Sequence, residues 1–82
     1  MTSIKKALVA VGKNTARTFH IGSNFDGDQG HLDIVSSTDG GFAVSVETGK
    51  STKERHFKKF SDLVLFVAQE NLLKKRCFLR FF

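Results

Sequence analysis

Apolar and polar residues alternate one by one through the middle of this chain. The alternation occupies residues 17–21, 31–35 and 42–46, where Phe, Ile, Leu or Val recur at every second position. A period of two with these residue types is typical of strands that bury one face. Asp39-Gly40-Gly41 predicts a hairpin between the second and third strands. Gly49-Lys50 predicts a reversal into a fourth strand over residues 54–58.

The segment that follows has helical spacing. Apolar residues between Leu63 and Leu73 form one broad face. We expect the helix to begin at Ser61, whose hydroxyl caps the first turn, with Phe60 and Leu65 packed against each other across that turn. The pattern therefore predicts an α+β fold: a small antiparallel sheet of three to four strands packed on one amphipathic helix in the C-terminal half.

Both ends of the chain are ambiguous. Residues 2–12 have apolar spacing that suits a helix capped by Thr2 or Ser3, although a strand also fits, and we favour the helix. Residues 77–82 alternate as a strand does, but no Gly or Pro separates them from the preceding helix. We prefer a strand here. Lys74, Lys75 and Arg76 are expected to lie near the negative C-terminal end of the helix.

Length and cysteine content limit the architecture. Eighty-two residues predict one small domain spanning 1–82. The only cysteine, Cys77, excludes an internal disulfide and a cysteine-based zinc site, and it fits a reducing compartment. No apolar stretch approaches the roughly 18 residues that a membrane span needs. We therefore expect a soluble, cytoplasmic protein.

Motifs that resemble ligand sites lack essential residues. Gly49-Lys50-Ser51-Thr52 resembles a phosphate loop, but Val44 stands where the first glycine is required. Residues 24–35 resemble a calcium loop, but Val35 stands where the bidentate glutamate is required. His20, His31 and His56 fall on one sheet face, where solvated histidines are more common than a zinc site. The sequence predicts no enzyme, no cofactor and no metal.

Charge is sorted along the chain. Residues 1–13 carry a net charge of +3, residues 14–49 carry −4, and residues 50–82 carry +6. The last segment also holds six of the nine phenylalanines. Such asymmetry indicates that one surface meets a polyanion, either nucleic acid or an anionic membrane.

Basic residues are concentrated in two places in the last segment. The first lies over the predicted turn and fourth strand and comprises Lys50, Lys53, Arg55, His56, Lys58 and Lys59. Lysine and arginine that contact phosphates release counterions and supply most non-specific affinity for nucleic acid. On an edge strand the same lysines also block aggregation.

The second place is the C-terminal run with Lys74, Lys75, Arg76 and Arg80. If this run is a strand, Arg76 and Arg80 alternate on one face with Phe78 and Phe82, and the rings can stack on bases. The same rings can instead close the core or a homodimer interface, or contact an anionic membrane. We rank core or dimer first, nucleic acid second and membrane third.

Residues 41–70 resemble a known type of DNA-binding module. Phe42-Ala43-Val44-Ser45-Val46 is followed by the Gly49-Lys50 turn, the basic strand that ends at Phe57, and the helix after Ser61. This order is similar to the three-stranded sheet plus helix of AP2-type domains and of the arm-binding domains of phage integrases. The resemblance implies DNA contacts by the outer sheet face and the turn, through Lys50, Lys53, His56 and Lys58. Asp33 and Glu47 are predicted on the same outer face.

Two functions follow from these patterns. The first is a small non-enzymatic module that binds nucleic acid, DNA or RNA, through the basic turn and strand and the basic tail. The alternative is a phage or mobile-element type of protein that binds and inhibits or modulates an acidic host protein. A membrane partner is ranked last, since one short basic and aromatic segment attaches only weakly.

Overall fold

The protein is built from one antiparallel sheet and two helices. The computed structural model describes residues 2–14, 17–25, 30–36 and 40–82. Its elements are β1 (Thr2–Ser3), α1 (Ile4–Gly12), β2 (Phe19–Phe25), β3 (Gly30–Ser36), β4 (Phe42–Glu47), β5 (Thr52–Phe57), α2 (Phe60–Gln69) and β6 (Arg76–Phe81). The predicted α+β class and the antiparallel sheet are confirmed. The sheet is larger than predicted, since six strands replace three to four and a second helix packs beside the first.

The additional strands come from the two ends of the chain. The sheet order is β1-β6-β2-β3-β4-β5, so β6 lies beside β2 and carries β1 on its other side. Phe19 of β2 is paired with Phe81 of β6, and Thr2 of β1 with Cys77 of β6. These pairings join residues that are far apart in sequence, and local alternation does not reveal them.

β3 and β4 form the predicted hairpin. Ser36 is paired with Phe42 at its closed end. Gly40 has a φ of +92°, a left-handed value that favours glycine. Asp39, the first residue of the predicted turn, lies outside the described residues.

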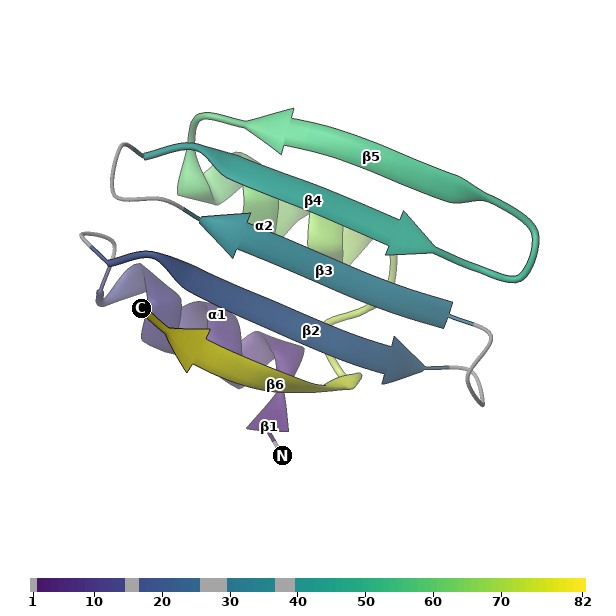
Figure 1. Ribbon diagram of the computed structural model, residues 1–82, viewed down its shortest axis with the longest axis horizontal. Helices are drawn as coiled ribbons and strands as arrows, with labels where there is room; N and C mark the ends of the chain where they lie inside the picture. The colour runs from purple at the N-terminus through teal and green to yellow at the C-terminus, as the bar shows by residue number, and fades with distance from the viewer. Residues whose placement is uncertain (1, 15–16, 26–29, 37–39) are drawn as a thin grey trace.

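Both helices cover the same face of the sheet (Figure 1). The core lies between the helices and this face. The strand residues that point toward the helices are apolar and buried: Phe19, Ile21, Leu32, Ile34, Phe42, Val44 and Val46. Phenylalanine rings connect the layers. The centroid of the Phe42 ring lies 6.2 Å from that of Phe19 in the sheet and 5.9 Å from that of Phe60 in α2. The opposite face of the sheet has no covering helix in the described part of the chain.

The N-terminal segment is a helix, as favoured from its spacing. The Ser3 hydroxyl accepts a hydrogen bond from the Lys6 N–H at 3.2 Å, which satisfies one of the free donors of the first turn. Ile4, Leu8 and Val11 are buried on one side of the helix. The two residues before it, Thr2 and Ser3, form strand β1. Residues 2–12 therefore contain mainly the favoured helix and a short piece of the alternative strand.

The second helix begins two residues earlier than predicted, since its N-cap is Lys59 and not Ser61. Lys59 has extended backbone and makes no side-chain capping bond, and Phe60 is the first helical residue. Ser61 is exposed and does not cap, and Leu65 is 57% exposed, so the predicted packing of Leu65 on Phe60 is wrong. The Phe60 ring packs on Phe42 instead, and this burial sets where the helix starts.

The end of α2 separates the helix from β6. Asn71 has a φ of +60°, and its N–H donates to the Ala68 carbonyl at 3.0 Å. The Leu72 N–H donates to the Val67 carbonyl at 3.2 Å. This pair of bonds is a Schellman motif, in which a left-handed residue ends the helix and buries the apolar residue that follows.

The basic run is therefore not at the helix terminus. Lys74 and Lys75 lie in the connection to β6, and Arg76 opens the strand, which corrects their predicted place at the end of α2. The preference for a C-terminal strand is confirmed. Cys77 is buried in that strand, and burial raises the pKa of its thiol above the ordinary value of 9.0. Neither described helix has the length and apolar content to cross a membrane.

Candidate nucleic-acid interface

The uncovered face of the sheet, called the open face here, carries most of the polar side chains of the strands. Strand pairing lines up its residues in rows across the sheet. One row is Arg80, His20, Val35, Ala43 and His56, and the next is Phe78, Gly22, Asp33, Ser45 and Glu54. His31 lies in the row beyond, beside Glu47. The three histidines therefore share this face, as the alternation predicts.

β6 contributes alternating cations and rings to the open face. Arg76, Phe78 and Arg80 are exposed, whereas Cys77 and Leu79 between them turn toward the helices. Phe82 continues the pattern, since its N–H donates to the Thr18 carbonyl at 2.8 Å and holds it beside β2.

These four residues, Arg76, Phe78, Arg80 and Phe82, are called the β6 stripe below. Phe78 is 63% exposed and Phe82 is 72% exposed. Side chains this apolar are rarely left in water as a group without a partner. The arrangement matches the predicted C-terminal set of cations interleaved with rings.

A hollow of about 310 Å³ lies beside the stripe. Phe78 and Arg80 of β6, His20 and Gly22 of β2, and His31 of β3 line it. Gly22 creates this space, because a Cβ at this position would lie 3.1 Å from Nε2 of His20. The hollow is thus bounded by one ring, one guanidinium and two imidazoles.

An acidic group lies beside the imidazole at the edge of this hollow. Nε2 of His20 lies 3.2 Å from Oδ1 of Asp33 on the neighbouring strand, which makes an ion pair when the imidazole is protonated. The imidazole lies over Gly22, in space that a side chain at this position would occupy. The alternation places Asp33 on this face, as predicted, but it assigns no role to Gly22, which follows the predicted strand pattern of residues 17–21.

Charge changes sign across the open face. Arg76 and Arg80 lie on β6 at one side, whereas Glu47 and Glu54 lie on β4 and β5 at the other. Asp33 on β3 lies between them. A polyanion is therefore attracted along β6 and β2 and repelled over β4 and β5.

The predicted basic turn and strand does not form one surface. Lys53 and Arg55 share the parity of Phe57 and point to the helix-covered side. Lys53 is paired with Glu70 at 2.8 Å, and the Arg55 guanidinium donates to the Glu54 carbonyl at 2.8 Å. The prediction that Lys53 lies on the outer sheet face is therefore wrong.

The other members of that set are spread along β5. Lys50 lies in the turn before the strand, and Lys58 and Lys59 follow its far end. At a rise of about 3.3 Å per residue, Lys50 and Lys58 are roughly 26 Å apart. Of the basic residues within β5 itself, only His56 projects onto the open face.

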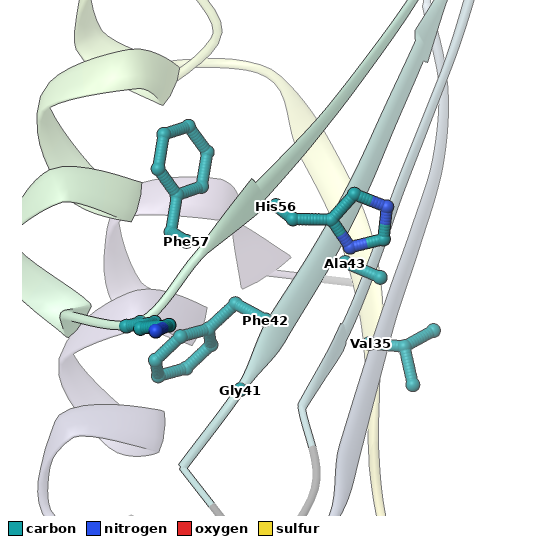
Figure 2. Close-up of a pocket in the computed structure, with 7 residues that line it drawn as sticks. Val35, Gly41, Phe42, Ala43, His56 and Phe57 are labelled. Carbon is teal, nitrogen blue, oxygen red and sulfur yellow. The ribbon is translucent and has the colours of Figure 1, made fainter.

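Figure 2 shows this sidedness at the end of the β4–β5 pair, where a second hollow of about 410 Å³ is found. Phe42 and Phe57 point toward the helices, whereas Val35, Ala43 and His56 point the opposite way. The hollow straddles the sheet edge and its lining is mainly apolar. His56 is paired with Ala43 on the neighbouring strand β4, so no cation lies directly beside it there.

No metal centre is evident in the described residues, among which no three His, Cys, Asp or Glu side chains form a group that could hold an ion. The histidines lie on β2, β3 and β5 and do not converge. The residues that resembled a calcium loop include 26–29, which lie outside the described part. Gly49-Lys50-Ser51 is a turn that leads into strand β5, without the helix that a phosphate loop needs.

Comparison with known proteins adds no relative: no protein-family model, curated protein or solved structure matches this chain. The open face and its side chains are therefore the basis for a functional assignment.

Proposed function

We propose that this protein is a non-enzymatic module that binds single-stranded nucleic acid on its open face, along the β6 stripe. The observation that carries the proposal is the exposed alternation of Arg76, Phe78, Arg80 and Phe82 on one strand. Proteins that bind single strands combine cations that track the backbone with rings on which bases stack.

The spacing of the stripe suits several nucleotides. Arg76 and Phe82 are six residues apart along an extended strand, which corresponds to roughly 20 Å. Phe78 lies between the two arginines, so a base stacked on its ring has a guanidinium on either side for the phosphates. The hollow at Gly22 adjoins Phe78 and provides room for a base edge, with His20 and His31 as hydrogen-bonding groups.

A single strand fits this face better than a duplex. Exposed rings stack on bases only where those bases are unpaired. A duplex laid across the sheet would place phosphates over Asp33, Glu47 and Glu54, which repel them. This repulsion weighs against the duplex DNA contacts that the AP2-type resemblance implies. We therefore propose that the contacts lie on β6 and not on β5.

The experiment is a titration of labelled single-stranded DNA, single-stranded RNA and duplex DNA, followed by fluorescence anisotropy. We expect both single strands to bind more tightly than the duplex. We also expect the logarithm of the binding constant to fall linearly with the logarithm of salt concentration. Replacing Phe78 and Phe82 by alanine should cost about 1–3 kcal/mol per stacked base.

The control is the pair Val9→Ala and Leu65→Ala, which removes comparably exposed apolar side chains from the helices. These changes should leave affinity unaltered. Equal affinity for the Phe78 and Phe82 double variant and for the wild type would refute the proposal, as would a preference for the duplex.

A protein partner is the second candidate. Exposed aromatic residues beside arginine are also the composition of protein-binding hot spots, and the acidic part of the open face suits a partner of mixed charge. A partner of this kind would be recovered as a stoichiometric complex that survives nuclease treatment. Recovery of nucleic acid alone would remove this candidate.

A further inference from the structure

The two edges of the sheet differ in how they are protected against pairing. β5 forms one edge, and its exposed side chains include Lys53, Glu54 and Arg55, which discourage addition of another strand. At the other edge, β1 covers β6 only at Arg76 and Cys77. Among the described residues, none pairs with the outer side of β6 beyond Cys77.

The backbone at this uncovered edge points outward. The Phe82 N–H donates to Thr18 of β2, so the even-numbered residues of the strand face β2. The Ile4 N–H donates to the Lys75 carbonyl on the opposite side, so the odd-numbered residues face outward. Leu79 and Phe81 therefore direct their N–H and C=O groups away from the sheet.

Among the described residues of β6 beyond Cys77, none directs a charge along the edge, although the Arg17 guanidinium lies 4.9 Å from the centroid of the Phe81 ring. Leu79 and Phe81 carry no charge, and the flanking rings of Phe78 and Phe82 are apolar and exposed. Natural sheets protect long edges with lysine, proline, bulges or inward charges. Residues 78–82 contain only Arg80 among charged residues, and it projects onto the open face rather than along the edge.

We infer that the uncovered edge of β6 pairs with the same edge of a second copy of this chain, in an antiparallel dimer centred on Arg80. The two-fold axis runs through the sheet at Arg80. Leu79 of each copy then lies opposite Phe81 of the other, and about four hydrogen bonds close the edge. Phe78 of each copy lies opposite Phe82 of the other, so aromatic rings pair on the open face.

Other registers fit less well. A shift by one residue would set the open face of one copy against the helix-covered face of the other. A dimer centred on Phe78 would require the outer side of Arg76 and Cys77, which β1 occupies. Centring on Arg80 uses only the part of the strand that no described residue covers on its outer side.

The dimer keeps the proposed binding surface accessible, because both helices of each copy lie on the opposite face. An unfavourable feature is the pair of Arg80 side chains beside the axis, which repel each other. We therefore expect association to strengthen as salt rises from 0.05 to 0.5 M.

The test combines sedimentation equilibrium with disulfide trapping in the full-length chain. In this register the two Arg80 residues form a non-hydrogen-bonded pair about 4.5 Å apart at Cα, within the range of a disulfide. Arg80→Cys should therefore give a covalent dimer under mild oxidation. Phe78→Cys should not, since the two copies of this residue lie roughly 13 Å apart.

The control is Leu65→Cys, at an exposed position on α2. Cys77 is buried and is expected to stay reduced in every variant. A monomer by sedimentation at 0.2 mM in 0.5 M salt would overturn the inference. So would cross-linking of Arg80→Cys no faster than Leu65→Cys.

A second variant separates this inference from the proposed function. Arg80→Thr removes the repulsion at the axis, so it should tighten the dimer severalfold while it weakens nucleic-acid binding. If nucleic acid does not bind at all, the sedimentation result still decides whether the dimer forms. Loss of dimer in Arg80→Thr would contradict the register.

Discussion

Gly22 has an effect on the open face that its size does not suggest. It lies inside β2, opposite Asp33 on one neighbouring strand and Phe78 on the other. Since it has no side chain, the imidazole of His20 can lie across it and reach the Asp33 carboxylate at 3.2 Å. The same absence opens the hollow beside Phe78, so one residue sets both the pocket and the direction of its imidazole.

We expect Gly22→Ala to fold normally and to bind single-stranded nucleic acid more weakly. The new methyl group would meet the end of a flexible side chain, which can move, and alanine is favoured over glycine inside a strand by roughly 0.5–1 kcal/mol. His20 should leave Asp33, and the hollow should narrow. Two-dimensional NMR of the His20 ring and an anisotropy titration measure these effects.

Ala43→Ser is the matched control for this substitution. Ala43 is exposed on β4 of the same face, away from the hollow, so the change should alter neither the His20 resonances nor the affinity. Unchanged His20 resonances in Gly22→Ala would show that the glycine does not set the imidazole position.

The sheet face of a single residue was predictable wherever another residue of the same strand could be assigned to the core or to solvent, because side chains alternate between the two faces. The alternation in β6 places Phe78 and Arg80 on one face, and the structure has them there. Lys53 and Arg55 were assigned by their charge. Their parity with Phe57 already indicates the helix-covered side, because a large apolar side chain such as this one is usually buried.

At the scale of elements, the end of α2 decides where β6 begins. The helix stops at Gln69 although no glycine or proline follows, because Asn71 takes the left-handed conformation at φ +60°. Leu72 then folds under Val67 into the core. The chain after this turn is free to run back beside β2.

Asn71 should therefore control the stability of this end of the molecule. We expect Asn71→Gly to stabilise the fold slightly, since glycine adopts positive φ without strain. Asn71→Val should destabilise it by about 1–2 kcal/mol, since a β-branched residue is strained there. Urea unfolding followed by circular dichroism gives the free energies.

Gln69→Val serves as the comparison, since it puts the same side chain on an exposed helical position and should cost about 0.5 kcal/mol. A loss in Asn71→Val no larger than in Gln69→Val would mean that the left-handed turn does not end the helix.

The elements themselves were largely predictable, and their assembly was not. The period of two in residues 17–58 and the helical spacing after Phe60 depend on local contacts, and both appear in the structure. β1 is too short to produce a period. The pairing of Phe81 with Phe19 depends on burial across the whole chain, which local periodicity does not encode.

At the scale of the whole molecule, the sheet order redistributes the sorted charge. The segment 50–82, with a net charge of +6, supplies both β5 and β6, and these strands lie on opposite sides of β2, β3 and β4. Its positive charge is therefore divided between two edges instead of forming one basic side. Arg76 and Arg80 share the open face with exposed rings, whereas Lys53 is neutralised by Glu70.

This division predicts that position, and not net charge, governs binding. The test uses two double variants. The first combines Arg76→Glu and Arg80→Glu on β6, and the second combines Lys50→Glu and Lys58→Glu at the two ends of β5. Both pairs lower the net charge from +5 to +1, so a non-specific electrostatic attraction would fall equally in the two. Loss of two phosphate contacts should reduce the salt slope for a single strand by about 1.4 in the β6 variant alone.

Anisotropy titrations of a single-stranded oligonucleotide between 0.05 and 0.2 M salt measure that slope. The lysines of the second variant flank β5, where Glu47 and Glu54 already repel phosphates, so their reversal should change the binding constant severalfold at most. Equal slopes in the two variants would assign binding to overall charge. A larger loss in the Lys50 and Lys58 variant would place the contacts on β5, where the resemblance to sheet-based DNA-binding modules puts them.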